Sequence, residues 1–137
     1  MDFLDKRVGV ICNELKKLKV KQVFPLTQWE YKEGNFIHPE DALKDEAAWE
    51  NFDCKTMHWY GKDRHYWFRT TYTIPEELDG KSVWIRVSSQ IDEWDDGRNP
   101  QFIVFVNGEV YQGIDMNHRE CLITRSGKAG ETLTIDL

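Results

Sequence analysis

The chain has 137 residues, of which 40% are hydrophobic and 31% charged, and its net charge is -6. The length fits one domain with a real core, and the hydrophobic content excludes a disordered chain. Because nucleic-acid binding depends on clustered lysine and arginine, the acidic balance argues against a nucleic-acid partner. The basic concentration of Lys16, Lys17, Lys19 and Lys21 lies where a helix is expected to end, and the helix dipole explains it.

The first predicted element is an amphipathic helix over residues 2–18, within an N-terminal segment of residues 1–21. Its apolar residues recur at alternating spacings of four and three: Leu4, Val8, Ile11, Leu15 and Leu18. Acidic residues begin the segment and lysines end it, which matches the helix dipole. A single helix with one apolar stripe must bury that stripe, so we expect it to pack on this domain or on a neighbouring one.

Residues 22–137 are predicted to form a second unit, a β-sandwich. Pro25 interrupts the first β-type segment, residues 22–31, which predicts an extended entry or an edge strand and excludes a central one. His38-Pro39-Glu40-Asp41 has the proline and acids of a helix start, so a short helix is expected over 39–49. Strands are expected at 66–74 and 82–88, which either pair with each other or lie in facing sheets.

A hairpin is predicted next, over residues 102–111. Five β-branched or aromatic residues lead into Asn107-Gly108, a pair that tolerates positive φ at both centres of a two-residue turn. Shorter β segments follow at 122–123 and 133–137. Many short strands with Gly and Pro turns predict a mainly β protein, a β-sandwich with an N-terminal helix.

Aromatic residues recur through a polar stretch that has little periodicity: Trp49, Phe52, Trp59 and Trp67. Two interpretations stay open, a sugar-stacking platform that uses Trp49, Trp59 or Trp94, or a lid that buries its rings against the core. We favour the lid, since aromatic residues in loops of mixed polarity usually point inward. The acidic loop around Trp94, residues 92–97, fails the pattern of a calcium loop at its third and twelfth positions and reads as solvated.

A dense polar cluster follows the hairpin: Asp115, Asn117, His118, Arg119 and Glu120. So many complementary groups at close spacing indicate either a fixed, salt-bridged corner or part of a site. The sequence contains no phosphate-binding glycine loop, HExxH or GxSxG motif, and its histidines lack metal-ligand spacing. We therefore expect no catalytic residue and no bound metal or cofactor in this chain.

The three cysteines (Cys12, Cys54 and Cys121) are far apart and include no CxxC pair, so free thiols are expected. Neither a signal-peptide-like apolar segment nor an apolar stretch of membrane-spanning length is present. A reducing, cytoplasmic compartment is the resulting expectation, with no membrane partner.

From about Trp49 onward, the chain resembles the N-terminal domain of glycoside hydrolase family 38, the cytosolic and vacuolar type of α-mannosidase. The resemblance rests on WFRTTYTIPEELDGKSVWIRV and on the hairpin FVNGE followed by the string QG-D-NHRE. The residues that match the string are Gln112, Gly113, Asp115, Asn117, His118, Arg119 and Glu120. The Trp-Phe-Arg run that leads to an Ile-Pro strand end is shared more loosely with galactose-binding-like jelly rolls.

The resemblance implies a jelly-roll β-sandwich that precedes a large catalytic region. In the family, two Asp and two His in that later region hold zinc, and one of those Asp is the nucleophile of a retaining mechanism. The implied function is a non-catalytic domain, structural and interdomain in role, of an enzyme that hydrolyses α-mannosides in glycan breakdown. Its implied partner is the catalytic domain of the same polypeptide, with the polar cluster facing it.

An autonomous carbohydrate-binding module is the alternative, with carbohydrate as the partner. The pattern at 132–137 reads as a strand cut short, so a truncated sandwich and self-association into a homo-oligomer are also expected.

Overall fold

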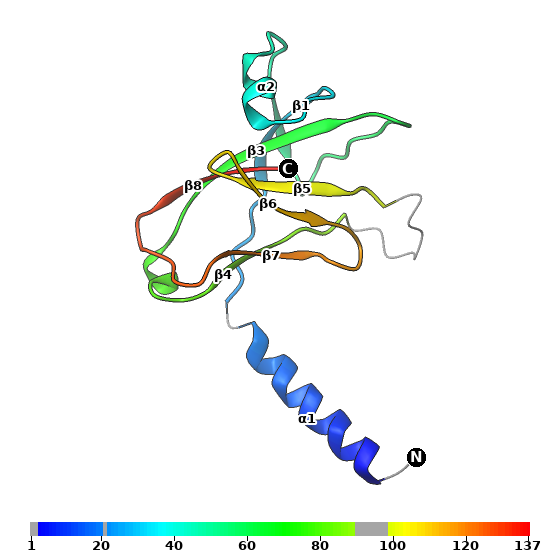
Figure 1. Ribbon diagram of the computed structural model, residues 1–137, viewed down its shortest axis with the longest axis vertical. Coiled ribbons are helices and arrows are strands. Elements are labelled where there is room, and N and C mark those ends of the chain that lie inside the picture. The colour runs from blue at the N-terminus through cyan, green and yellow to red at the C-terminus, as the bar shows by residue number, and fades with distance from the viewer. Residues whose placement is uncertain (1–2, 21, 90–98) are drawn as a thin grey trace.

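The computed structural model describes residues 3–20, 22–89 and 99–137. Within these ranges the chain forms two α-helices, eight strands and one 3-10 turn, and Figure 1 shows their arrangement. In chain order they are α1 (Phe3–Lys19), β1 (Gln28–Glu33), α2 (Pro39–Lys44), β2 (Glu50–Asp53), β3 (Tyr66–Thr73), the turn η1 (Glu76–Leu78), β4 (Val83–Arg86), β5 (Phe102–Val106), β6 (Glu109–Ile114), β7 (Glu120–Thr124) and β8 (Thr132–Asp136). The predicted mainly β architecture with an N-terminal helix is confirmed.

The strands form two antiparallel sheets. The larger has the order β2-β1-β3-β8-β5-β6, and the smaller consists of β4 and β7. The expected strands at 66–74 and 82–88 therefore lie in different sheets, which decides between the two arrangements that the sequence allowed. Figure 1 shows β4 and β7 beside each other beneath the larger sheet.

The main core lies between these sheets. Strand β4 turns Val83 and Ile85 inward, and β7 turns Cys121 and Ile123 inward, following the alternation of a strand with one buried face. The larger sheet contributes buried residues from its strands, and Ile74 directly after β3 joins them. These residues are Trp29, Phe52, Phe68, Ile74, Val104, Val106, Ile114, Leu133 and Ile135. This packing is consistent with a β-sandwich.

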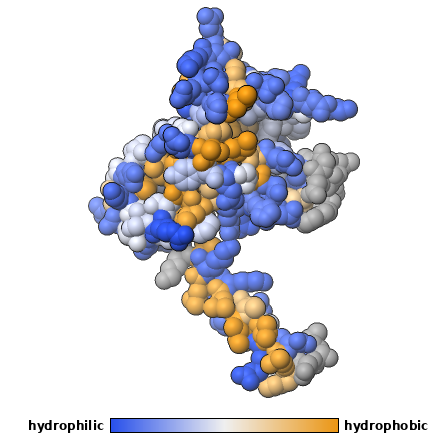
Figure 2. Space-filling model, in the orientation of Figure 1, coloured by the Kyte–Doolittle hydropathy of each residue, from blue (hydrophilic) through white to orange (hydrophobic). Residues whose placement is uncertain are grey.

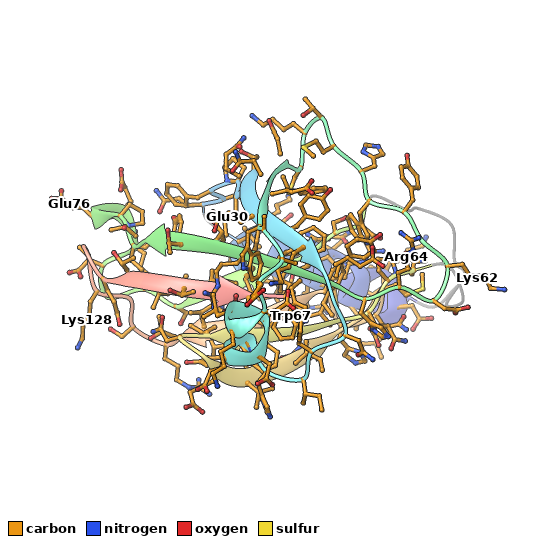
Figure 3. All side chains as sticks on the ribbon, turned by 90° about the horizontal axis from the view of Figure 1, so that it is seen from above. Glu30, Lys62, Arg64, Trp67, Glu76 and Lys128 are labelled. Atoms are coloured by element: carbon orange, nitrogen blue, oxygen red, sulfur yellow. The ribbon has the colours of Figure 1, made fainter. Side chains whose placement is uncertain are left out.

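The opposite face of the larger sheet is partly covered by the α2 segment. Trp67 and Phe105 point to this side, and with Ala42 of α2 they form a second, smaller cluster. The rings of Trp67 and Phe105 lie 5.6 Å apart, and Trp67 is seen beside α2 in Figure 3. Strands β3 and β5 therefore bury side chains on both faces, which explains the adjacent buried pairs Trp67-Phe68 and Val104-Phe105.

Two of the predicted boundaries need correction. The first β segment was expected to be extended or at an edge, but β1 lies inside the sheet between β2 and β3. The exclusion of a central strand was wrong because β1 begins at Gln28, three residues after Pro25, so the missing N–H of the proline lies outside the ladder. The expected helix over 39–49 ends at Lys44, and β2 begins at Glu50.

Helix α1 is confirmed, but it projects away from the sandwich (Figure 1). None of its described residues is buried, and the apolar stripe lies open along it in Figure 2. The stripe residues Leu4, Val8, Ile11, Leu15 and Leu18 are 52–66% exposed. Packing on its own domain, one of the two expected outcomes, is therefore excluded; Asp2 and Lys21 lie outside the described residues. Within the described part of the chain, no helix is long and apolar enough to cross a membrane.

Candidate functional site

The β5–β6 hairpin fixes the position of the polar cluster. Asn107 and Gly108 have φ values of 51° and 86°, as the predicted turn requires. The turn is also tied to β8, because the N–H of Asn107 donates to the Thr134 carbonyl at 2.8 Å and the N–H of Thr134 donates to Asn107 Oδ1 at 2.9 Å. The hairpin turn is thus fixed to β8, and Asp115 follows directly after β6, the edge strand of the larger sheet.

The Asp115 carboxylate organises the turn that follows β6. Its Oδ1 accepts hydrogen bonds from the N–H groups of Asn117, at 2.8 Å, and His118, at 2.7 Å. The His118 ring nitrogen Nδ1 lies 3.1 Å from the same oxygen. The amide of His118 above all, and then that of Asn117 and the His118 ring, hold the pKa of Asp115 below its usual range, against a smaller opposing effect of desolvation. Such a carboxylate stays ionised at neutral pH, which makes it a fixed acceptor and a poor general base.

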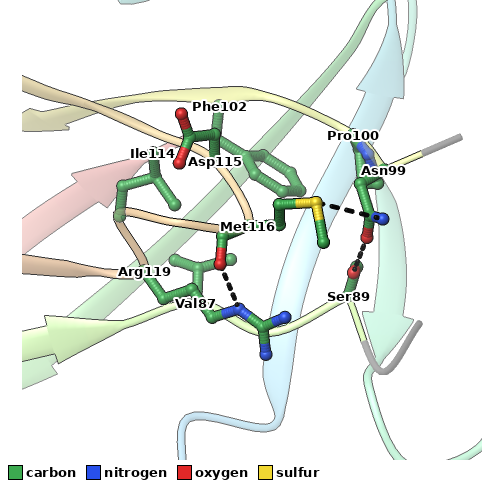
Figure 4. Close-up of a pocket in the computed structure, with 9 residues that line it drawn as sticks. All are labelled: Val87, Ser89, Asn99, Pro100, Phe102, Ile114, Asp115, Met116 and Arg119. Carbon is green, nitrogen blue, oxygen red and sulfur yellow. Dashed lines mark hydrogen bonds between the residues drawn. The ribbon is translucent and has the colours of Figure 1, made fainter. Parts of the chain in front are cut away.

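Arg119 bonds within the same turn and lines a small pocket beside it. Its Nε donates to the Met116 carbonyl at 3.0 Å (Figure 4). Among the described residues, its side chain has no carboxylate partner, so a salt-bridged corner built on Arg119 is not found. The pocket walls are built by Val87, Ser89, Asn99, Pro100, Phe102, Ile114, Asp115, Met116 and Arg119.

A second hollow of about 140 Å³ adjoins this pocket and shares Asn99, Asp115 and Met116 with it. In the wall, Ser89 Oγ donates to Asn99 Oδ1 at 3.1 Å, and Asn99 Nδ2 lies 3.8 Å from Met116 Sδ (Figure 4). The volume is below that of typical ligand pockets, so the region offers hydrogen bonds to a docking surface better than it encloses a ligand.

Glu120 leaves the turn and faces α1. Its carboxylate lies 2.7 Å from Lys19 Nζ, and its carbonyl accepts a hydrogen bond from Gln112 Nε2 at 2.9 Å. The structure therefore separates the predicted cluster into two parts. Asp115, Asn117 and His118 share one carboxylate, whereas Glu120 connects the end of the helix to β7.

The candidate sugar-stacking residues Trp49 and Trp59 both pack inward. Trp59 is half-buried and contacts Phe52, Phe68 and Phe102 edge-on, with ring centroids 5.0–6.1 Å apart. Trp49 is half-buried with Lys32 Nζ at 5.3 Å and Arg69 Cζ at 5.8 Å from its ring centre. Neither ring forms an open platform, an arrangement that favours the lid interpretation. Trp94 and the acidic loop lie outside the described residues.

Sequence reasoning missed a buried charged group beneath the α2 segment. Lys32 is 4% exposed, and its ammonium group lies 2.9 Å from Asp45 Oδ1 while donating to the carbonyls of Asp45 and Ala47 at 3.3 and 3.2 Å. Lys32 and the Ala47 amide hold the pKa of Asp45 low, against a smaller effect of desolvation. No local pattern marks Lys32, because its partners come from a loop more than ten residues away. The Lys32 ammonium group therefore anchors the loop after α2, and it is too buried to contact a ligand.

No set of three or more potential metal ligands is present among the residues that the structure describes. The cysteines Cys12, Cys54 and Cys121 are free, and burial raises the pKa of the Cys54 and Cys121 thiols. The class that fold and site define is a mainly β protein with a hydrogen-bonding turn beside a shallow pocket. Comparison of the chain with protein-family models, curated proteins and solved structures finds no match.

Proposed function

We propose that the chain is a non-catalytic jelly-roll domain, of the galactose-binding-like type, that precedes the catalytic region of a zinc-dependent retaining α-mannosidase. The observation that carries the proposal is the string QG-D-NHRE, which spans the end of β6, the Asp115 turn and the start of β7. In this proposal the domain is structural and interdomain, and its partner is the catalytic region of the same cytoplasmic polypeptide. Zinc belongs to that region.

The strand neighbours support the jelly-roll assignment. The last strand, β8, lies between β3 and β5, and β7 pairs with β4 across the intervening hairpin. Neighbours that are far apart in the sequence are typical of Greek-key connections, from which jelly rolls are built.

The surface around the Asp115 turn supports an interdomain role. The turn is preorganised by its own hydrogen bonds, and it presents the exposed His118 ring and the half-buried Arg119 beside the pocket. Rigid polar groups at the edge of a shallow hollow suit a packed interface, because little conformational entropy is lost when a partner covers them.

The first test reads the coding sequence that follows Leu137. The proposal requires a catalytic region with a zinc site of two Asp and two His. A reading frame that closes without such a region would overturn it. A companion assay uses the 137 residues alone with an aryl α-mannoside and metal analysis, and we expect neither hydrolysis nor stoichiometric zinc. Zinc-dependent turnover by this chain would contradict the non-catalytic assignment.

A second test places substitutions in the full-length enzyme. Arg119→Lys keeps the charge but removes the fork of guanidinium donors. Arg125→Lys, at an exposed residue directly after β7, makes the same change outside the turn and is the control. For an interdomain surface, we expect Arg119→Lys to lower turnover in the parent while the isolated domain keeps its melting temperature. If Arg119→Lys instead lowers the melting temperature of the isolated domain as much as that of the full-length enzyme, the role of Arg119 is to stabilise the fold of this domain.

A further inference from the structure

The exposed stripe of α1 has the geometry of a coiled-coil seam. Its residues alternate at four and three, so Val8 and Leu15 occupy heptad positions a, and Leu4, Ile11 and Leu18 occupy positions d. Phe3 and Val10 at positions c and Cys12 at position e are further apolar residues of α1 that lie outside the a/d stripe. A helix that packs on a sheet or in a core usually carries a wider stripe with period 3.6, whereas an a/d stripe is the narrower seam between two helices. The spacing therefore fits a second helix of the same kind.

The charges that flank the seam match those of a second copy. Asp5, Cys12 and Lys19 lie at positions e, and Arg7 and Glu14 lie at positions g. In a parallel pair, each g residue faces the e residue five places further along the partner, so Glu14 meets Lys19 and Arg7 meets the neutral Cys12. Both contacts avoid like charges, and each occurs twice by symmetry.

The side chains at the seam do not by themselves set the number of strands. In parallel dimers a β-branched residue at a with leucine at d selects the two-stranded form, which Val8 at a with Leu4 and Leu18 at d satisfies. Leu15 at a and Ile11 at d are the reverse combination, which favours larger assemblies. The present ion pairs of Glu14 with Lys17 and of Lys19 with Glu120 do not oppose dimerisation. Their side chains are 30–69% exposed, and exposed pairs exchange partners at little cost.

We propose that α1 is a dimerisation element, which forms a parallel two-stranded coiled coil with α1 of a second copy of this chain. The dimer places the two sandwiches beside each other at the C-terminal end of the coil, and residues 22–27, which form no helix or strand, connect each sandwich to it. The seam covers fewer than three heptads, so the dissociation constant lies in the micromolar range or above. This inference is independent of the proposed function.

The test is sedimentation equilibrium of the full chain over a range from low micromolar to near-millimolar concentration. Val8→Glu and Val10→Glu form a matched pair, because the same residue changes to the same charge on the same helix at 52% and 61% exposure. Val8 lies in the seam and Val10, at position c, lies outside it. We expect Val8→Glu to weaken dimerisation by at least about tenfold, since it buries two charges in the seam. Val10→Glu should leave it unchanged.

Charge exchange tests the orientation. Glu14→Lys places like charges opposite Lys19 and should weaken the parallel dimer, and adding Lys19→Glu should restore it. In an antiparallel pair the residues at g face each other, so the double variant would instead leave the introduced lysine side chain against Arg7 and show no recovery.

A monomeric wild-type chain at all concentrations, a trimer or larger assembly, or equal effects of Val8→Glu and Val10→Glu would each overturn the proposal. If α1 is protected from hydrogen exchange only in a longer polypeptide that stays monomeric, the partner of α1 is intramolecular and the proposal is also overturned.

Discussion

Arg69 and Asp136 connect β3 to β8 through a buried ion pair. Arg69 Nε and Nη2 donate to the two carboxylate oxygens of Asp136 at 2.6 and 3.0 Å, and the Asp136 side chain is 1% exposed. We expect Arg69→Met to lower the free energy of unfolding by about 3–5 kcal/mol, because it leaves a buried carboxylate without its partner. Chemical denaturation of the isolated chain measures this.

The double variant Arg69→Met with Asp136→Leu is the control for that substitution. Replacing both charges with apolar groups removes the unpaired carboxylate, so most of the lost stability should return. If the double variant is as unstable as Arg69→Met, the loss comes from the packing of Arg69 on Trp49 rather than from the charge.

The Asp115 turn should be sensitive to acid. The pKa of Asp115 is lowered in the fold, so its contribution to stability is complete above the ordinary pKa of an aspartate, about 3.9, and is lost as the pH falls through the lower folded value. The protection factors of the Asn117 and His118 amides, which are corrected for the intrinsic pH dependence of exchange, should fall in that acidic window. Asp115→Asn retains an acceptor oxygen and should remove the pH dependence, whereas Asp115→Ala should expose both amides at every pH. Protection factors that stay constant through the acidic window in the wild type would show that Asp115 does not control the turn.

At this scale the sequence predicted the members of the cluster better than their partners. Asp115 and His118 are three residues apart, so their contact follows from a tight turn. The pairing of Glu120 with Lys19 spans 101 residues, and the buried site of Lys32 depends on a loop beyond β1. No local pattern encodes either contact.

Among the elements, the β5–β6 hairpin was predicted most closely because its turn is chemically specific. Gly108 has a φ of 86°, and an added Cβ would meet nothing within 4 Å, so Gly108→Ala tests the backbone alone. We expect a loss of about 1–2 kcal/mol in unfolding free energy from the left-handed conformation. Gly9→Ala is the matched control, because it is equally unobstructed but lies in a helix, where alanine should increase helical ellipticity. A loss of stability at both positions, or at neither, would contradict this account.

Elements whose limits depend on tertiary contacts were predicted less well. The expected helix over 39–49 has suitable residues after Lys44, but the Lys32 ammonium group binds the carbonyls of Asp45 and Ala47, and helical hydrogen bonding gives way to that anchor. Strand β1 was wrongly excluded from the interior of the sheet because Pro25 was taken as part of the strand, whereas the strand begins at Gln28.

At the scale of the whole molecule, the many short strands predicted a β-sandwich, but the sequence left open whether the strands at 66–74 and 82–88 pair or lie in facing sheets. The strand order depends on pairings such as β3 with β8, which join residues more than 50 positions apart. Whether a strand lies at an edge or at the centre follows from such pairings, which local patterns do not encode.

The division between α1 and the sandwich leads to a final prediction. None of the described residues of α1 is buried, and the ion pair of Lys19 with Glu120 joins its end to the sandwich. Exposed ion pairs contribute about 0–1 kcal/mol, so a chain that begins at Gln22 should keep the unfolding free energy of the full chain to within about 1 kcal/mol. The comparison uses thermal and denaturant unfolding at submicromolar concentration, below the dissociation constant of the proposed dimer. Glu120→Gln in the full chain serves as the control for the lost ion pair. A shortened chain that unfolds far more easily than Glu120→Gln would show that α1 stabilises the sandwich through contacts other than this pair, and the helix could then no longer be treated as a separate interaction element.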